Sequence, residues 1–161
     1  MKMDTSKVIQ KKDMKKEANM ELEKNKDIAR RFTQVWGKGE LDIIDELASP
    51  DLSVYYPVFP DVIKGPEAFK QMLTRIRSAF GDRDLKVDEE IAEGDKVVLR
   101  WTWTITHQAE FLPGVPPTGK RMTSTGISIY RIADGKVVEE RGEEDALGLF
   151  RQLGLVPEPP A

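Results

Sequence analysis

A single histidine at the end of an aromatic run is the feature of this chain best suited to chemistry. His107 is the only histidine, and it ends the extended run 97–107. Because strand side chains alternate between the two faces of a sheet, the odd-numbered residues of this run, Trp101 and Trp103 among them, share one face with His107. Such a face can bind a flat apolar ligand, and an imidazole can transfer a proton to or from it. A histidine at a strand end can equally well hydrogen-bond a neighbouring loop.

Composition excludes several classes of protein. The chain has 161 residues, of which 39% are hydrophobic and 33% charged, enough for one domain with a substantial core. It has no cysteine, which excludes thiol nucleophiles and thiolate metal sites, and its lone histidine predicts no metal site of another kind. A net charge of −3 without a dense basic patch predicts no nucleic-acid partner. No apolar stretch reaches the ~18 residues of a membrane span, and no secretory signal is apparent, so we expect a cytoplasmic protein.

Charge patterning divides the chain near residue 25. Residues 1–24 contain seven Lys against five Asp and Glu, with few apolar residues. We expect this segment to be a flexible charged arm, although its thin apolar stripe would permit a marginal helix. Residues 25–161 then form a single domain.

The order of hydrophobic periodicities in this domain predicts an α+β fold. Residues 28, 32, 35 and 36 are apolar at helical spacing, and Gly65-Pro66 is typical of the start of another helix. From Leu85 onward the period changes to two, and Asp134-Gly135 predicts a tight hairpin. We expect a curved, mainly antiparallel sheet packed on the N-terminal helices, forming an open cone with an internal pocket.

Several short motifs in the second half of the chain belong together. They are His107-Gln108-Ala109-Glu110-Phe111, Pro116-Pro117-Thr118-Gly119-Lys120, Gly135-Lys136-Val137-Val138-Glu139-Glu140, and Asp145 before Gln152-Leu153-Gly154. In these motifs the chain resembles the SnoaL-like polyketide cyclase (ester cyclase) family, of the nuclear transport factor 2-like, cystatin-like superfamily. The resemblance extends over residues 25–156, nearly everything except the N-terminal arm.

This resemblance implies a reaction and two catalytic residues. Characterised members of the family close a ring of an aromatic polyketide by an intramolecular aldol reaction in a hydrophobic cavity, without a metal or an organic cofactor. An aspartate acts as acid and base with help from a histidine, and the matching residues here are Asp145 and His107. The chain departs from the family pattern at Arg141, where a tryptophan is typical, and at Tyr56, where a histidine is frequent.

The residues themselves suit this chemistry, and each also has a simpler role. A carboxylate near the mouth of an apolar pocket has a raised pKa and becomes a better base near neutral pH. Asp145 can instead cap the helix that follows it. We expect the substrate to contact Tyr56 and Arg141, although arginines near acidic residues often form surface ion pairs. The planar walls of the pocket would come from Trp101, Trp103 and Phe111.

Two other functions remain open at this point. One is a non-catalytic module that binds a small hydrophobic ligand or serves only for dimerisation. The other is an epoxide hydrolase or ketosteroid isomerase-like enzyme. For the hydrolase, Arg141 and Asp145 would supply part of the Asp-Arg-Asp cluster that activates water. An enzyme of the cyclase type should have His107 and Asp145 facing one cavity within reach of a hydrogen bond or a single water. Under every alternative we expect a homodimer, formed through the β-branched face of residues 123–129.

Overall fold

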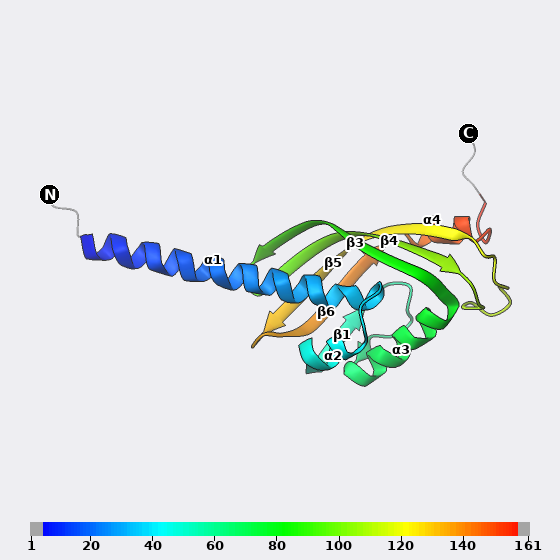
Figure 1. Cartoon of the computed structure of the whole chain (residues 1–161), viewed down its shortest axis with the longest axis horizontal. Helices are drawn as coiled ribbons and strands as arrows, with labels where there is room; N and C mark the ends of the chain where they lie inside the picture. Colours follow the sequence, from blue (N-terminus) through cyan, green and yellow to red (C-terminus); the bar gives the residue numbers. More distant parts are fainter. Residues whose placement is uncertain (1–4, 158–161) are drawn as a thin grey trace.

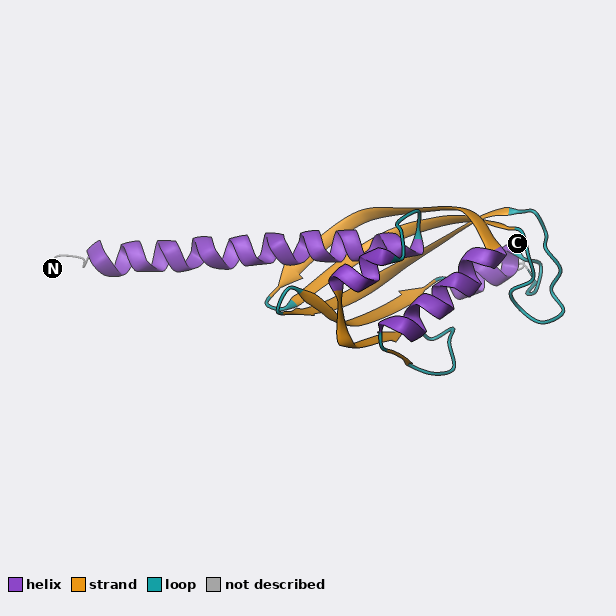
Figure 2. Ribbon diagram, turned by 60° about the horizontal axis from the view of Figure 1, so that its bottom comes forward, coloured by secondary structure: helices purple, strands orange, loops and turns teal. Residues whose placement is uncertain are grey.

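The helices of the protein gather on one face of a six-stranded sheet (Figures 1 and 2). The computed structural model describes residues 5–157. The elements in chain order are α1 (Thr5–Thr33), a 3-10 turn (Gln34–Trp36), α2 (Asp42–Leu47), β1 (Ala48–Tyr55), β2 (Ile63–Lys64), α3 (Pro66–Ala79), β3 (Phe80–Glu93), β4 (Lys96–His107), β5 (Arg121–Ala133), β6 (Lys136–Glu144) and α4 (Ala146–Gln152). This arrangement confirms the predicted α+β class.

The sheet is a meander with one added edge. Its strand order is β2-β1-β6-β5-β4-β3, and β3 to β6 pair antiparallel with their neighbours in the chain, as the short turns predict. β1 joins the far side of β6 in parallel, a pairing between distant segments that local sequence patterns do not reveal. The sheet stays open and is mainly antiparallel, as predicted.

Strand β3 is longer than the sequence indicates and bends the sheet. It begins at Phe80, directly after α3, whereas the change of period predicts a start at Leu85. Its pairing with β4 shifts register between Gly81 and Asp84 and again between Val87 and Glu89. Such irregularities increase the local twist and curve a sheet, which gives this one its concave inner face.

Helix α1 crosses the predicted boundary at residue 25 without interruption. It begins at Thr5, so the arm is helical from that residue on, the alternative that its thin apolar stripe would permit. The first half of the helix projects beyond the sheet (Figures 1 and 2). Its second half is anchored by the buried side chains of Ile28 and Phe32, whereas residues 9–21 are exposed. Of the predicted arm, residues 1–4 lie outside the described residues, and its flexibility stays a prediction.

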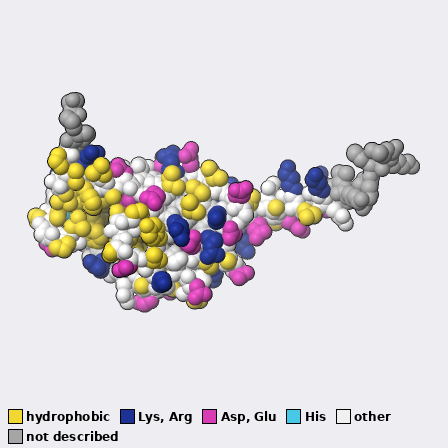
Figure 3. Space-filling model, turned by 180° about the vertical axis from the view of Figure 1, so that it is seen from behind, with side chains coloured by type: hydrophobic (Ala, Val, Ile, Leu, Met, Phe, Trp, Pro, Cys, Tyr) yellow, Lys and Arg dark blue, Asp and Glu magenta, His cyan; other side chains and the backbone are white. Residues whose placement is uncertain are grey.

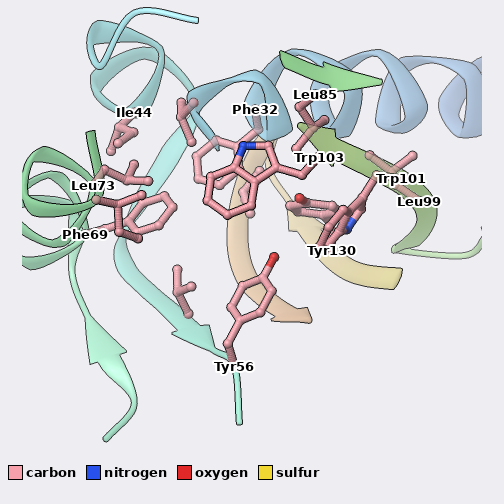
Figure 4. Close-up of a cluster of buried hydrophobic side chains, with 14 of the residues drawn as sticks. Phe32, Ile44, Tyr56, Phe69, Leu73, Leu85, Leu99, Trp101, Trp103 and Tyr130 are labelled. Carbon is pink, nitrogen blue, oxygen red and sulfur yellow. The ribbon is translucent and has the colours of Figure 1, made fainter. Parts of the chain in front are cut away.

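The core fills the space between the inner face of the sheet and the helices. Phe32 from α1, Phe69 from α3 and Tyr130 from β5 meet there, with ring centroids 5.9 and 6.1 Å from that of Phe32 (Figure 4). None of the helices between residues 5 and 157 is both long enough and apolar enough to cross a membrane.

Candidate active site

A cavity of about 410 Å³ opens at the end of the molecule that lies away from the projecting part of α1. Apolar side chains gather on the surface at this end (Figure 3). Strands of the inner face, α3, α4 and the loops near residues 58–60 and 111–113 supply the walls. The aromatic residues in the lining are Trp36, Tyr56, Phe59, Phe80, Trp101, Trp103, Phe111 and Phe150. All three tryptophans of the chain therefore face one pocket.

Four of the residues predicted to contact substrate lie in this lining: Tyr56, Trp101, Trp103 and Phe111. Their rings fit because two strands carry glycine beneath them. A Cβ on Gly142 would lie 2.0 Å from the Tyr56 ring, and a Cβ on Gly126 would lie 2.4 Å from the Trp101 ring. The bare backbone at these positions is what lets the rings lie flat against the sheet.

A buried carboxyl group holds the polar ends of several of these rings. Oε1 of Glu140 accepts hydrogen bonds from Nε1 of Trp36 at 2.8 Å, the hydroxyl of Tyr56 at 2.6 Å and the hydroxyl of Tyr130 at 3.2 Å. Its Oε2 is buried without a partner among the described residues. Burial raises the pKa of Glu140 from 4.5 to about 7, against the effect of the three donors, which lower it.

The indole N–H groups of the other two tryptophans also donate hydrogen bonds to protein oxygens. Nε1 of Trp101 donates to Oγ of Ser128 at 2.9 Å, and that hydroxyl also lies 2.9 Å from the hydroxyl of Tyr56. Nε1 of Trp103 donates to the carbonyl oxygen of Trp36 at 2.9 Å. The Trp and Tyr side chains in the lining thus present ring surface to the cavity, while their donors bond to the protein.

Glu144 is the acidic residue that lines the cavity. It stands at the end of β6 and shares the inward face with Glu140 and Gly142, because strand residues of equal parity share a face. Within residues 5–157 its carboxyl group has no hydrogen-bond or ion-pair partner, and burial alone raises its pKa from 4.5 to about 7. A carboxyl group with this pKa is half ionised at neutral pH and can both accept and return a proton.

His107 lies behind the cavity wall rather than in it. Its ring is buried and packs on Phe80, with the ring centroids 5.4 Å apart. The backbone N–H of Thr118 donates to its Nδ1 at 3.2 Å. The backbone N–H of His107 donates to the carbonyl oxygen of Lys120, and its carbonyl oxygen accepts from the N–H of Gly119. In this structure His107 therefore anchors the loop that follows β4, the alternative that the sequence left open.

Asp145 lies at the N-terminus of α4 on the protein surface. Its carboxylate accepts a hydrogen bond from the backbone N–H of Gly148 at 2.8 Å, which is the geometry of a helix cap. Its own N–H bonds to Thr125, which pairs with Thr102, five residues before His107 on β4. At about 3.3 Å per residue, some 16 Å along the strands separates Asp145 from His107. The structure does not bring the predicted pair together, because each side chain has a separate structural partner.

Arg141 does not line the cavity. Its parity on β6 places it on the outer face of the sheet, opposite to Glu140. There it pairs with Glu139 at 3.2 Å and its guanidinium lies 5.9 Å from the centroid of the Tyr55 ring. Arg141 therefore lies outside the cavity lining in this structure, and its contact with substrate stays a prediction.

The acidic residues of β6 are what sequence reasoning missed. Charged residues are mostly exposed, so residue type alone predicts that the Glu140 and Glu144 side chains face solvent. The available signal was their spacing of four on one strand, which predicts a shared face. In the described part of the chain, no group of three or more His, Asp or Glu side chains is placed to hold a metal ion.

Comparison with known proteins identifies the family. The sequence model of the SnoaL-like polyketide cyclases matches residues 26–153. The chain belongs to this family. Among its relatives, the aklanonic acid methyl ester cyclase DnrD of Streptomyces peucetius is 29% identical over 133 residues, which are 80% of this chain and 89% of the relative. The nogalonic acid methyl ester cyclase of Streptomyces nogalater is 29% identical over 123 residues, 76% of this chain and 92% of the relative.

Solved structures agree with the fold of this SnoaL-like protein. AclR of Streptomyces galilaeus superposes with a TM-score of 0.75 at 32% identity, covering 86% of this chain and 90% of AclR. An LEH-like epoxide hydrolase of M. tuberculosis has a TM-score of 0.67 at 18% identity, covering 83% of this chain and 91% of the hydrolase. The second likeness concerns the fold alone.

Proposed function

We propose that this protein is a cyclase that closes a carbocyclic ring of an apolar, carbonyl-bearing polyketide by intramolecular aldol addition, with Glu144 as acid and base. The observation that carries the proposal is a carboxyl group without a partner in the lining of an aromatic cavity, with a pKa near 7. The relatives named as methyl ester cyclases support the reaction class. Glu144 takes the role that the family resemblance gave to Asp145.

The reaction needs no redox step and no external reactant. The Glu144 carboxylate removes a proton from the carbon next to one carbonyl group, and the resulting enolate carbon attacks a second carbonyl carbon of the same molecule. A carbon–carbon bond forms, the π bond of the second carbonyl breaks, and the alkoxide takes the proton back from Glu144. Substrate and product are isomers, and a properly placed base of matched pKa contributes ~10²- to 10⁴-fold to such a rate.

The cavity supplies orientation as well as a base. The ring faces of Trp101, Trp103 and Phe111 can stack on a planar substrate and exclude water from the enolate. Glu140 acts as a positioning residue, because its carboxyl group fixes Trp36 and Tyr56 in the wall. Fixed walls favour the folded substrate conformation in which the two reacting carbons approach each other.

A non-catalytic binding module is the second candidate. The observation that favours it is that His107 and Asp145 lie apart, with neither in the cavity lining. A hydrolase of the Asp-Arg-Asp type has less support, because Arg141 and Asp145 both lie outside the lining.

Turnover separates the cyclase from the binding module. The purified protein would be incubated with aklanonic acid methyl ester and with nogalonic acid methyl ester, and isomeric products would be followed by chromatography and mass spectrometry. We expect ring closure by the wild type, a loss of at least ~100-fold in Glu144→Gln, and no loss in Glu143→Gln, whose side chain is exposed. Stoichiometric binding without any product from either ester would favour the binding module.

We also propose that the protein is cytoplasmic and forms a homodimer through the outer face of its sheet. Ile91, Ile127 and Ile129 stand exposed on that face, and Ile129 pairs across the strands with Val98, which in turn pairs with Ile91. An apolar row of this kind is typical of a protein interface. Light scattering should give the mass of a dimer for the wild type and of a monomer for Ile129→Glu; a monomeric wild type at tens of micromolar would contradict the dimer.

A further inference from the structure

The cavity lining contains one cation besides the Glu144 carboxyl group. Arg75 stands on α3 one residue before Ile76 and three after Met72, so all three side chains share the face that lines the cavity. Arg75 is exposed to solvent, which places its guanidinium at the mouth. The pocket is otherwise lined by uncharged residues.

Arg75 is distinguished from its neighbours by having no protein partner. Within residues 5–157 its side chain makes no ion pair and no hydrogen bond. Two residues on, Arg77 donates to the backbone oxygens of Val35 and Gly39, and Arg83 donates to that of Phe80. Arg77 and Arg83 thus serve the fold, whereas the Arg75 guanidinium is available to a ligand.

The rest of the lining cannot easily replace this group. The indole and phenol donors of Trp36, Tyr56, Trp101 and Trp103 all bond to protein oxygens. A ligand oxygen that carries a full negative charge would therefore find its matching charge at Arg75. Glu144, when ionised, repels such a group, so the two charges together favour one orientation of an anionic ligand.

We propose that Arg75 binds a free carboxylate of the ligand at the mouth of the cavity, so that among apolar polycyclic ketones this protein prefers an acid to its ester. The proposal rests on the proposed function, since it concerns the ligand of the same cavity. A guanidinium pairs with a carboxylate through two parallel hydrogen bonds, whereas an ester offers only a neutral acceptor. The relatives are named for methyl esters, so a preference for the free acid would distinguish this chain from them.

The test compares an acid with its own ester in the same pocket. Anthraquinone-2-carboxylate and its methyl ester would be titrated into the full chain, and binding would be followed by tryptophan fluorescence, since all three tryptophans line the cavity, with calorimetry as a check. We expect the wild type to bind the acid about tenfold more tightly than the ester, as for a partly solvated charge-assisted contact. Arg75→Gln should bind the acid about tenfold more weakly than the wild type does, with its affinity for the ester unchanged. The affinity of Arg75→Lys for the acid should lie between those of the wild type and Arg75→Gln.

A matched variant controls for the general effect of charge. Lys70 lies on the same helix outside the cavity, where it pairs with Asp45, so Lys70→Gln removes the same charge and should leave both affinities unchanged. The proposal would be overturned if the wild type bound acid and ester equally, or if Arg75→Gln kept the wild-type ratio of acid affinity to ester affinity. Neither result would affect the cyclase assay. Failure of both compounds to bind would also overturn it, and the turnover assay then decides separately on the proposed function.

Discussion

Glu140 and Glu144 have similar pKa values but different hydrogen-bond partners. Both face inward from β6, and burial raises the pKa of each to about 7. Three donors converge on one oxygen of Glu140, so this carboxyl group organises the aromatic wall. Glu144 has no such donors and lies in the cavity lining. This difference in hydrogen bonding is why we propose Glu140 as the positioning group and Glu144 as the acid and base.

The buried carboxyl groups make stability depend on pH. Because the pKa of Glu140 is about 7 in the folded protein and 4.5 in the reference state, folding favours its protonated form. Its contribution is complete below about pH 4.5 and is lost as the pH rises to about 7, on the order of 3 kcal/mol in total. Urea unfolding at pH 5, 6, 7 and 8 should therefore show falling stability in the wild type and a flatter profile in Glu140→Gln.

A nearby exposed residue provides the control for that experiment. Glu143 lies on the opposite face of β6, so Glu143→Gln should keep the pH dependence of the wild type. A Glu140→Gln profile parallel to that of the wild type would mean that Glu140 does not titrate in this range.

Two substitutions at Asp145 separate capping from catalysis. Asparagine caps a helix about as well as aspartate does, whereas alanine loses the bond to Gly148 and should destabilise the protein by about 1 kcal/mol. If Glu144 is the base, Asp145→Asn keeps both stability and turnover. A loss of turnover of ~100-fold or more in Asp145→Asn, with unchanged thermal unfolding, would instead restore the catalytic role that the resemblance predicted.

At the scale of elements, β6 depends on Gly142 to seat the aromatic wall. A methyl group there would collide with the Tyr56 ring and displace its hydroxyl from Glu140. We expect Gly142→Ala to cost about 1–3 kcal/mol, the usual size of an overpacking effect. In a Tyr56→Leu background the same change should cost less, and chemical unfolding of the four proteins measures the coupling. Equal costs in both backgrounds would show that the ring does not constrain residue 142.

Local patterns predict most elements and only part of the site. Strand alternation placed Trp101 and Trp103 on the cavity face, and Gly65-Pro66 marked the start of α3. The outward position of Arg141 could not be predicted, because the pairing of β5 with β6 shifts register near Ile132 and no local signal fixes the parity that follows. Arg75 was missed because nothing in its sequence neighbourhood shows that the helix lies over a pocket.

At the scale of the whole molecule, the sheet separates two kinds of surface. Its concave face and the helices enclose the aromatic cavity, while its outer face presents the isoleucines of the proposed dimer interface. The first part of α1, residues 5–24, projects away from both of these surfaces (Figure 1). The proposed ligand site and the proposed dimer interface therefore lie on opposite faces of the sheet and need not compete.

The measurement that tests the central claim most directly is the pH dependence of kcat/KM for ring closure between pH 5 and 9. If Glu144 is the base, kcat/KM rises with pH through one ionisation near 7, because only the carboxylate can remove the proton. Glu144→Gln should then be inactive throughout, and Glu143→Gln should follow the wild type. A rate independent of pH over this range, or turnover retained in Glu144→Gln, would contradict the account.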